Sequence, residues 1–149
     1  MAQTAEELTA FINENLGGWN RAMGLQFQLV TADEVRGQVV IGEQHLQPYG
    51  IVHGGVHAGL IEAACSTGAA IYAMANGQSV VGLENATSFL RAARGGTIKV
   101  TAKPLQRGRR TQVWEATVTD DTDRPLASGK VRVICLDPDS ALAGKKLER

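Results

Sequence analysis

Apolar and polar positions alternate in two adjoining runs near the start of the chain. Residues 24–31 and 35–42 place apolar side chains at about every second position, and Asp33 and Glu34 lie between the two runs. Alternation with a period of two is typical of a half-buried strand, and an acidic pair between two such runs indicates a turn. We therefore predict a β-hairpin in this part of the chain.

Four further strand-like runs follow later in the chain. They cover residues 80–92, 97–105, 111–119 and 125–136. Residues typical of turns separate them, at positions 95–96, 107–109 and 120–123. This pattern predicts four strands that pair consecutively and antiparallel.

Two segments have helical rather than strand-like patterns. Thr4 followed by Glu7 has the form of a capping box, and apolar residues then recur at helical spacing, which predicts a short helix over residues 5–15, ended by Gly17-Gly18. The stretch from Gly54 to about Met74 is apolar on nearly every face, which predicts a buried central helix.

One such helix and six strands indicate an α+β fold. A curved antiparallel sheet of about six strands, wrapped around the central helix, hides the whole circumference of that helix. The short N-terminal helix then lies outside this unit. Because such a sheet has free edges, we expect association with a second copy of the chain.

Length and composition limit the possible functions. The 149 residues suffice for one domain, expected over residues 1–136, with a polar and irregular tail over residues 137–149. Fifteen basic and fifteen acidic residues leave no net charge, which argues against binding to nucleic acid or to an anionic membrane. No secretory signal is visible, and Cys65 and Cys135 lack metal-ligand spacing. We expect a cytoplasmic protein without a metal or cofactor.

Glu62 is the one residue between His57 and Glu84 that carries a full charge near neutral pH. An ionised carboxylate is costly to bury in an apolar helix. Two interpretations stay open: a structural glutamate paired with an arginine, or a catalytic group that attacks a substrate or activates water. Ser66 lies one turn later on the same face and is placed to donate to Glu62 or to hold the water.

The residues before the central helix carry donors suited to a developing negative charge. Gly54 begins the helix, where backbone N–H groups lack partners and where no Cβ obstructs a substrate oxygen. Gln47 offers a second donor through its amide group. A tight turn before a helix explains the glycine as well, and His53 either positions a carbonyl group or only packs at the helix start. His57 is interpreted as structural.

Basic residues concentrate between residues 91 and 110, where seven Lys or Arg occur and no Asp or Glu. Arginine suits bidentate contact with phosphate, so this run is a candidate site for a phosphate-bearing ligand. A solvated strand face is the alternative interpretation.

Residues 47–55, QPYGIVHGG, with Glu62 nine positions after His53, resemble the hot-dog-fold thioesterases. The nearest branch is the PaaI-like one, which includes glutamate-type 4-hydroxybenzoyl-CoA thioesterases, dihydroxynaphthoyl-CoA hydrolases and enterobactin proofreading thioesterases. The resemblance continues in order through VVGLE at 80–84, LRAAR at 90–94, KPL at 103–105 and VW at 113–114. Phe89 departs from it, because some relatives carry histidine there.

The resemblance implies an enzyme that hydrolyses an acyl-CoA thioester to a free acid and CoA. It implies Glu62 as nucleophile or general base, the Gly54 N–H and Gln47 as the oxyanion hole, and His53 and Ser66 as further catalytic residues. It also implies contacts with the substrate or its CoA arm from Gly82, Phe89, Leu90, Arg91, Ala92, Arg94, Gln106, Arg107, Gly108, Arg109, Arg110 and Thr111.

Members of this family form dimers through a shared sheet, commonly pairs of dimers, so the resemblance implies a homodimer or homotetramer with the site at a subunit interface. Aromatic acyl groups such as hydroxybenzoyl or dihydroxynaphthoyl are expected, with medium-chain acyl-CoA or acyl-carrier-protein thioesters as the alternative. Two less favoured interpretations are a dehydratase or hydratase of the same fold and a non-catalytic acyl-CoA sensor. The former has a different context around its histidine, and the latter would not need Glu62.

Overall fold

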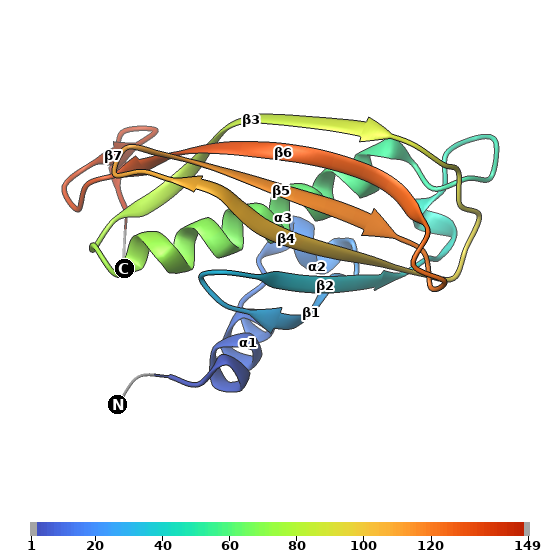
Figure 1. Ribbon diagram of the computed structural model, residues 1–149, viewed down its shortest axis with the longest axis horizontal. Helices are drawn as coiled ribbons and strands as arrows, with labels where there is room; N and C mark the ends of the chain where they lie inside the picture. The colour runs from blue at the N-terminus through green and yellow to red at the C-terminus, as the bar shows by residue number, and fades with distance from the viewer. Residues whose placement is uncertain (1–2, 148–149) are drawn as a thin grey trace.

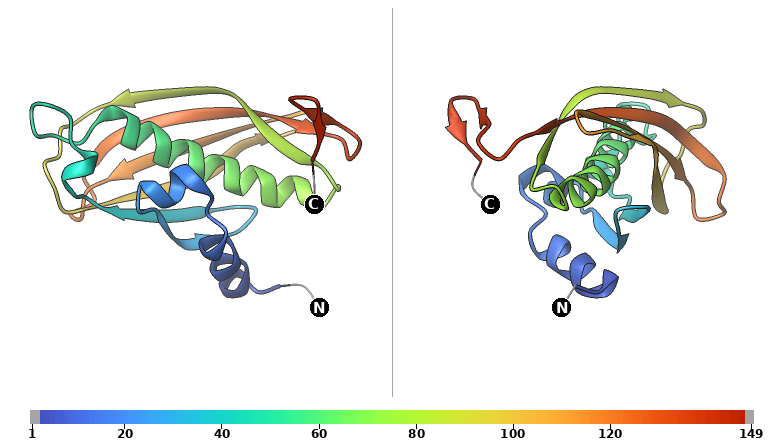
Figure 2. Two further views of the ribbon diagram at one scale, coloured as in Figure 1. Left: turned by 180° about the vertical axis from the view of Figure 1, so that it is seen from behind. Right: turned by 60° about the vertical axis from the view of Figure 1, so that its left-hand side comes forward.

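A six-stranded antiparallel sheet curves around one long helix in the structure, a computed structural model that describes residues 3–147 (Figure 1, Figure 2). The helix, α3, spans Gly54–Met74. The strands are β1 (Gln26–Val30), β2 (Val35–Val40), β3 (Ser79–Phe89), β4 (Thr97–Arg107), β5 (Thr111–Thr119) and β6 (Pro125–Leu136). The predicted hot-dog fold is confirmed.

The strand order corrects one part of the prediction. It runs β1-β2-β4-β5-β6-β3, so β3 pairs with β6 and not with β4. Other loops hold the segment between β3 and β4, since the Val52 N–H donates to Ala93 O at 2.8 Å and the Ile41 N–H donates to Gly96 O at 2.9 Å. This segment therefore crosses the end of the sheet instead of forming a hairpin. As a result, β3 lies at an edge with a single neighbour.

The sheet approaches α3 closely because small residues line parts of the helix. Gly68 faces the ring of Trp114 on β5, and a Cβ at this glycine would stand 2.5 Å from the indole. Trp114 is completely buried, as are Leu60 and Ile61 of α3. Glycine at position 68 thus sets the distance between helix and sheet.

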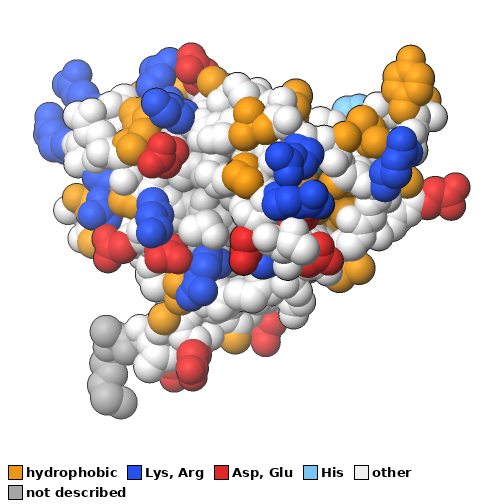
Figure 3. Space-filling view, turned by 45° about the vertical axis from the view of Figure 1, so that its right-hand side comes forward, with side chains coloured by type: hydrophobic (Ala, Val, Ile, Leu, Met, Phe, Trp, Pro, Cys, Tyr) orange, Lys and Arg blue, Asp and Glu red, His pale blue; other side chains and the backbone are white. Residues whose placement is uncertain are grey.

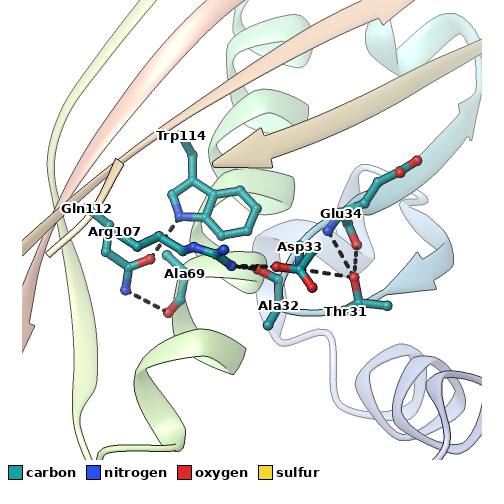
Figure 4. A network of polar contacts seen from close by, with 8 residues as sticks. All are labelled: Thr31, Ala32, Asp33, Glu34, Ala69, Arg107, Gln112 and Trp114. Carbon is teal, nitrogen blue, oxygen red and sulfur yellow. Dashed lines mark hydrogen bonds and ion pairs between the residues drawn. The ribbon is translucent and has the colours of Figure 1, made fainter. Parts of the chain in front are cut away.

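A buried polar group links β5 to the helix (Figure 4). Gln112 Nε2 donates to the Ala69 carbonyl of α3 at 3.1 Å, and Gln112 Oε1 accepts from Trp114 Nε1 at 2.9 Å. Buried polar groups are stable when they are hydrogen-bonded. These two bonds satisfy both ends of the Gln112 amide and fix the orientation of the Trp114 ring.

Two helices precede the sheet. α1 (Ala5–Glu14) carries the predicted capping box, in which Thr4 and Glu7 exchange hydrogen bonds of 2.9 and 3.1 Å. α2 (Gly18–Ala22) is not indicated by the sequence, because five residues are too short to show an apolar period. Gly17, with φ of +75°, turns the chain from α1 into α2.

The C-terminal segment is more regular than expected. Within the tail predicted over residues 137–149, β7 (Ala141–Leu142) pairs with β8 (Lys145–Lys146). The turn between them contains Ala143 and Gly144, both with positive φ, as a tight hairpin requires. A short 3₁₀ helix, η1 (Glu43–His45), precedes the loop before α3. Among residues 3–147, no helix is long and apolar enough to cross a membrane.

Candidate active site

Glu62 lies half-buried on α3, and both of its carboxylate oxygens are hydrogen-bonded. Ser66 Oγ donates to Oε1 at 3.1 Å, in agreement with their helical spacing. Asn85 Nδ2, from β3, donates to Oε2 at 3.0 Å. No arginine pairs with Glu62 among the described residues. The interpretation of Glu62 as a structural glutamate paired with an arginine therefore finds no support among the described residues.

Asn85 is held in one orientation by its neighbours. Thr87 Oγ1 donates to Asn85 Oδ1 at 2.7 Å, and Asn85 Nδ2 also donates to Ala58 O at 3.0 Å. Because the amide oxygen accepts from Thr87, the amide NH₂ faces Glu62. Sequence analysis missed Asn85, since 23 residues separate it from Glu62 and no motif joins them.

Gly82, which has no side chain, leaves room for the Glu62 carboxylate. A Cβ at this position on β3 would stand 2.9 Å from Glu62 Oε1. The structure thus places Gly82 beside Glu62, where the resemblance expected a substrate contact.

A cavity of about 460 Å³ opens beside Glu62. It is lined by Trp19, Asn20, Gly59, Glu62, Ala63, Ser66, Thr67, Ala70 and Val80. Among these residues Glu62 alone is charged. Trp19 and Asn20 belong to α2, so their contribution could not be predicted without that helix.

The start of α3 presents a backbone donor. His53 caps the helix, with its Nδ1 accepting from the Gly55 N–H at 2.8 Å, and the Val56 N–H donates to His53 O at 2.9 Å. Within residues 3–147 the Gly54 N–H has no partner. His53 is thus a capping residue, and the cap leaves one N–H free at the positive end of the helix.

Gln47 lies near Gly54. Its Oε1 accepts from the Tyr49 N–H, so its amide NH₂ is the group left available. Gln47 and Gly54 both line a cavity of about 380 Å³, together with His57, Phe89, Leu90, Arg91 and Ala92. The two predicted oxyanion donors therefore share one cavity.

The Phe89 ring occupies the space beside Gly54 in which a substrate oxygen was expected. A Cβ at Gly54 would stand 2.8 Å from Phe89 Cζ. The glycine thus lets the Phe89 ring pack against the start of α3, and that close approach gives a structural reason for it.

Glu62 and the two predicted oxyanion donors line different cavities of the same chain. Eight residues of α-helix separate Gly54 from Glu62, a rise of about 12 Å. A carbonyl group under attack must be about 3 Å from both its oxyanion donors and its attacking oxygen. One chain alone therefore does not bring the two groups to one substrate carbonyl.

The basic run does not form a single patch in one chain. Arg91 and Arg94 precede β4, whereas Arg107 ends it and residues 108–110 follow it, and a strand of this length separates the two groups by about 33 Å. On the face shown in Figure 3, Lys and Arg side chains occur in several small groups, with Asp, Glu and hydrophobic side chains between them. Within one chain an extended strand therefore lies between the two basic segments, residues 91–94 and 107–110.

Two of these arginines have structural partners. Arg107 pairs with Asp33 at 2.7 Å and donates to Ala32 O at 2.8 Å (Figure 4). Its guanidinium also lies 4.4 Å above the Tyr72 ring. Arg94 donates to Tyr49 O at 3.1 Å, which ties the β3–β4 segment to the Gln47 loop. Both side chains are thus engaged in holding loops together.

The remaining predicted contacts of the β4–β5 turn lie at the far end of the molecule from Gly54. Arg107, Gly108 and Arg109 line a cavity of about 430 Å³ with Tyr72, Asn76, Gln78 and Asp137. Gln106 belongs to β4 and Thr111 begins β5, and Arg110 O accepts from the Cys135 N–H at 2.7 Å. No three His, Cys, Asp or Glu among residues 3–147 are grouped to hold a metal ion.

Two buried groups near the site are neutral near pH 7. Burial lowers the pKa of His57, whose Nδ1 is buried without a partner. Burial, followed by the charges of Glu62 and Glu115, raises the pKa of the Cys65 thiol. Because Cys65 stays protonated, no thiolate stands near Glu62.

Comparisons with known proteins agree with this geometry. The thioesterase superfamily profile matches residues 49–127. The "Putative esterase Rv1847" of Mycobacterium tuberculosis (strain H37Rv) is 44% identical over 113 residues, covering 74% of this chain and 81% of that protein. Its solved structure has a TM-score of 0.79 and 43% identity, covering 80% of this chain and 96% of that one.

A second relative carries a more specific name. The 1,4-dihydroxy-2-naphthoyl-CoA hydrolase of Escherichia coli (strain K12) is 31% identical over 134 residues, covering 89% of this chain and 95% of that protein. The profile match extends over more than half of the chain, and the relatives are matched over most of their length. The chain therefore belongs to the thioesterase superfamily, as the motif at residues 47–55 and Glu62 predicted.

Proposed function

We propose that the protein hydrolyses the thioester of an aromatic acyl-CoA, with Glu62 as the reacting carboxylate and with Gly54 and Gln47 as the oxyanion hole. One observation carries the proposal: Glu62 stands at a cavity with both oxygens held by neutral donors, Ser66 and Asn85, and no cation among residues 3–147 pairs with it. The name of the E. coli relative, 1,4-dihydroxy-2-naphthoyl-CoA hydrolase, supports an aromatic acyl-CoA as the substrate class.

Two routes are compatible with this arrangement. In one, a Glu62 oxygen bonds to the carbonyl carbon, the C–S bond breaks, CoA leaves as the thiolate, and water then cleaves the mixed anhydride. In the other, Glu62 takes a proton from water, that water forms the new C–O bond, the C–S bond breaks, and CoA leaves as the thiolate, which takes up the proton. In both routes the carbonyl oxygen gains negative charge, which the Gly54 N–H and the Gln47 amide stabilise.

Each site is proposed to combine Glu62 of one chain with Gly54 and Gln47 of the partner subunit. When a two-fold axis relates two α3 helices, a residue that meets a second residue of the partner helix is itself met by that second residue from the other side. If Gly54 of one helix lies beside Glu62 of the other, the axis therefore passes near the midpoint, residue 58. Ala58 is where Asn85 of β3 binds α3. Because β3 has an open edge, pairing of two β3 strands near Asn85 would produce this arrangement.

The same two-fold arrangement supports a joint role for the two basic segments. β4 separates Arg91 from Arg109 within one chain, but an antiparallel partner places opposite ends of the two subunits side by side. We propose that Arg91 from one chain and the turn at residues 108–110 from the other contact the phosphates of CoA.

The test is release of free CoA thiol from 4-hydroxybenzoyl-CoA, followed with a thiol reagent. The wild-type protein should release thiol, and Glu62→Gln should reduce kcat by at least about 10²-fold, the usual worth of a catalytic base or nucleophile. Glu84→Gln is the matched control, since Glu84 is an exposed carboxylate on β3, 3.8 Å from Arg132. Full activity in Glu62→Gln would refute the assigned chemistry, and an inert wild type would favour a non-catalytic acyl-CoA sensor.

A further inference from the structure

The helix α2 supplies an aromatic wall to the Glu62 cavity that the reaction itself does not require. Trp19 lines this cavity and is 63% exposed, the largest side chain among its lining residues. A Cβ at Gly59 would stand 3.1 Å from Trp19 Nε1 and 3.0 Å from Met23 Sδ. The indole thus lies directly against α3, and Gly59 makes that approach possible.

The indole is close to the reacting carboxylate. Gly59 and Glu62 are three residues apart and share one face of α3. Trp19 therefore stands about one helical turn from Glu62. An acyl group whose carbonyl carbon is attacked by Glu62, or by a water that Glu62 activates, has this ring beside it.

The rest of the cavity leaves room for a flat group. Gly59, Ala63 and Ala70 present little or no side chain, and Val80 of β3 adds an apolar contact. Two polar groups, the Asn20 amide and the Thr67 hydroxyl, have no hydrogen-bond partner within residues 3–147. A ring that bears a hydroxyl group would find both an apolar surface and polar neighbours here.

We propose that Trp19 is a specificity-determining residue that selects acyl groups with a planar aromatic ring. The proposal rests on the thioesterase function proposed above. Aromatic rings stack on an indole in offset or edge-on geometry and gain more than the burial of area alone provides. An alkyl chain in the same place gains only the burial, so the indole favours aryl over alkyl substrates.

The experiment compares kcat/KM for 4-hydroxybenzoyl-CoA and hexanoyl-CoA in three proteins: wild type, Trp19→Ala and Trp19→Phe. Trp19→Ala should lower the ratio of aryl to alkyl kcat/KM by about two- to tenfold, the range expected when an aromatic pair is lost. Trp19→Phe keeps a ring and should restore most of that ratio. Phe11→Ala, which removes an exposed aromatic side chain of α1, is the matched control and should leave the ratio unchanged.

The outcomes separate this proposal from the function on which it rests. If wild type hydrolyses neither thioester, the proposed function fails. If wild type is active and Trp19→Ala changes both substrates equally or not at all, Trp19 is no selector. A change in the sedimentation coefficient of Trp19→Ala with an unchanged ratio would likewise overturn the proposal, and would show that the indole packs between subunits.

Discussion

Two inactive variants should restore each other's activity if every site joins two chains. One variant carries Gln47→Ala and the other carries Glu62→Gln. Alone, Gln47→Ala removes a proposed oxyanion donor and should lower kcat by about 10²–10³-fold. Glu62→Gln removes the proposed reacting carboxylate and should lower kcat by at least about 10²-fold. The expectation of rescue follows from the rise of about 12 Å between Gly54 and Glu62 along α3.

The size of the rescue can be calculated from the two-fold symmetry. In a hybrid dimer one site receives both substitutions and the other receives neither, so each hybrid has one intact site. Random exchange of subunits makes half of the dimers hybrids, and an equal mixture should therefore recover about a quarter of wild-type activity. A site contained within one chain would give no recovery.

The assay is thiol release from 4-hydroxybenzoyl-CoA after the variants are mixed and allowed to exchange subunits. The control mixes wild type with the double variant Gln47→Ala/Glu62→Gln. Here every hybrid site carries one defect, so activity should fall from half to about a quarter of an equal amount of wild type as exchange proceeds. Constant activity in both mixtures, with exchange verified by a mass tag, would refute the shared site.

Three further outcomes follow from single contacts. Asn85→Leu removes a hydrogen bond to the Glu62 carboxylate, so kcat should fall about tenfold or more with little change in KM. Ser88→Leu on the same strand is the control, and an equal loss of kcat in that variant would contradict a specific role for Asn85. Gly68→Ala places a Cβ against the Trp114 ring and should lower the free energy of unfolding by about 1–3 kcal/mol, measured by urea denaturation, with the better helix propensity of alanine offsetting part of the loss. Gly95→Ala, which has open space around it, should cause no such loss. Burial raises the pKa of Asp120, but hydrogen bonds from Thr122 and Arg124 outweigh it and hold that pKa below its usual range. Its stabilising effect is complete above the unfolded value of about 3.9 and is lost as the pH falls through the folded value, so the Tm gap between wild type and Asp120→Asn should narrow on acidification; a gap of constant size would disagree.

Local signals predicted the elements well where one period dominates. Gly54–Met74 was found at both ends, because its all-round apolar pattern begins after a capping residue and stops before Asn76-Gly77. β5 and β6 were also found at their observed ends, since turn residues border both strands. α2 escaped detection because five residues show no period.

Contacts between distant segments were harder to predict. The pairing of β3 with β6 joins strands that lie far apart in the sequence, and hydrogen bonds from Val52 and Ile41 hold the segment between β3 and β4. The amide of Asn85 meets Glu62 only after β3 is laid along α3. The charge run at residues 91–110 looks continuous in sequence, but β4 carries its two halves to opposite ends of the molecule.

Under the proposed shared site, the open edge of β3 makes activity per chain depend on the concentration of the chain. If completing a site requires a second chain at that edge, activity per chain follows mass action and drops once dilution separates the subunits. A newly made chain would then hydrolyse no thioester until it associated with a second copy. Turnover at low expression would rise with the square of chain number, so gene dosage would act on hydrolysis more steeply than on protein amount.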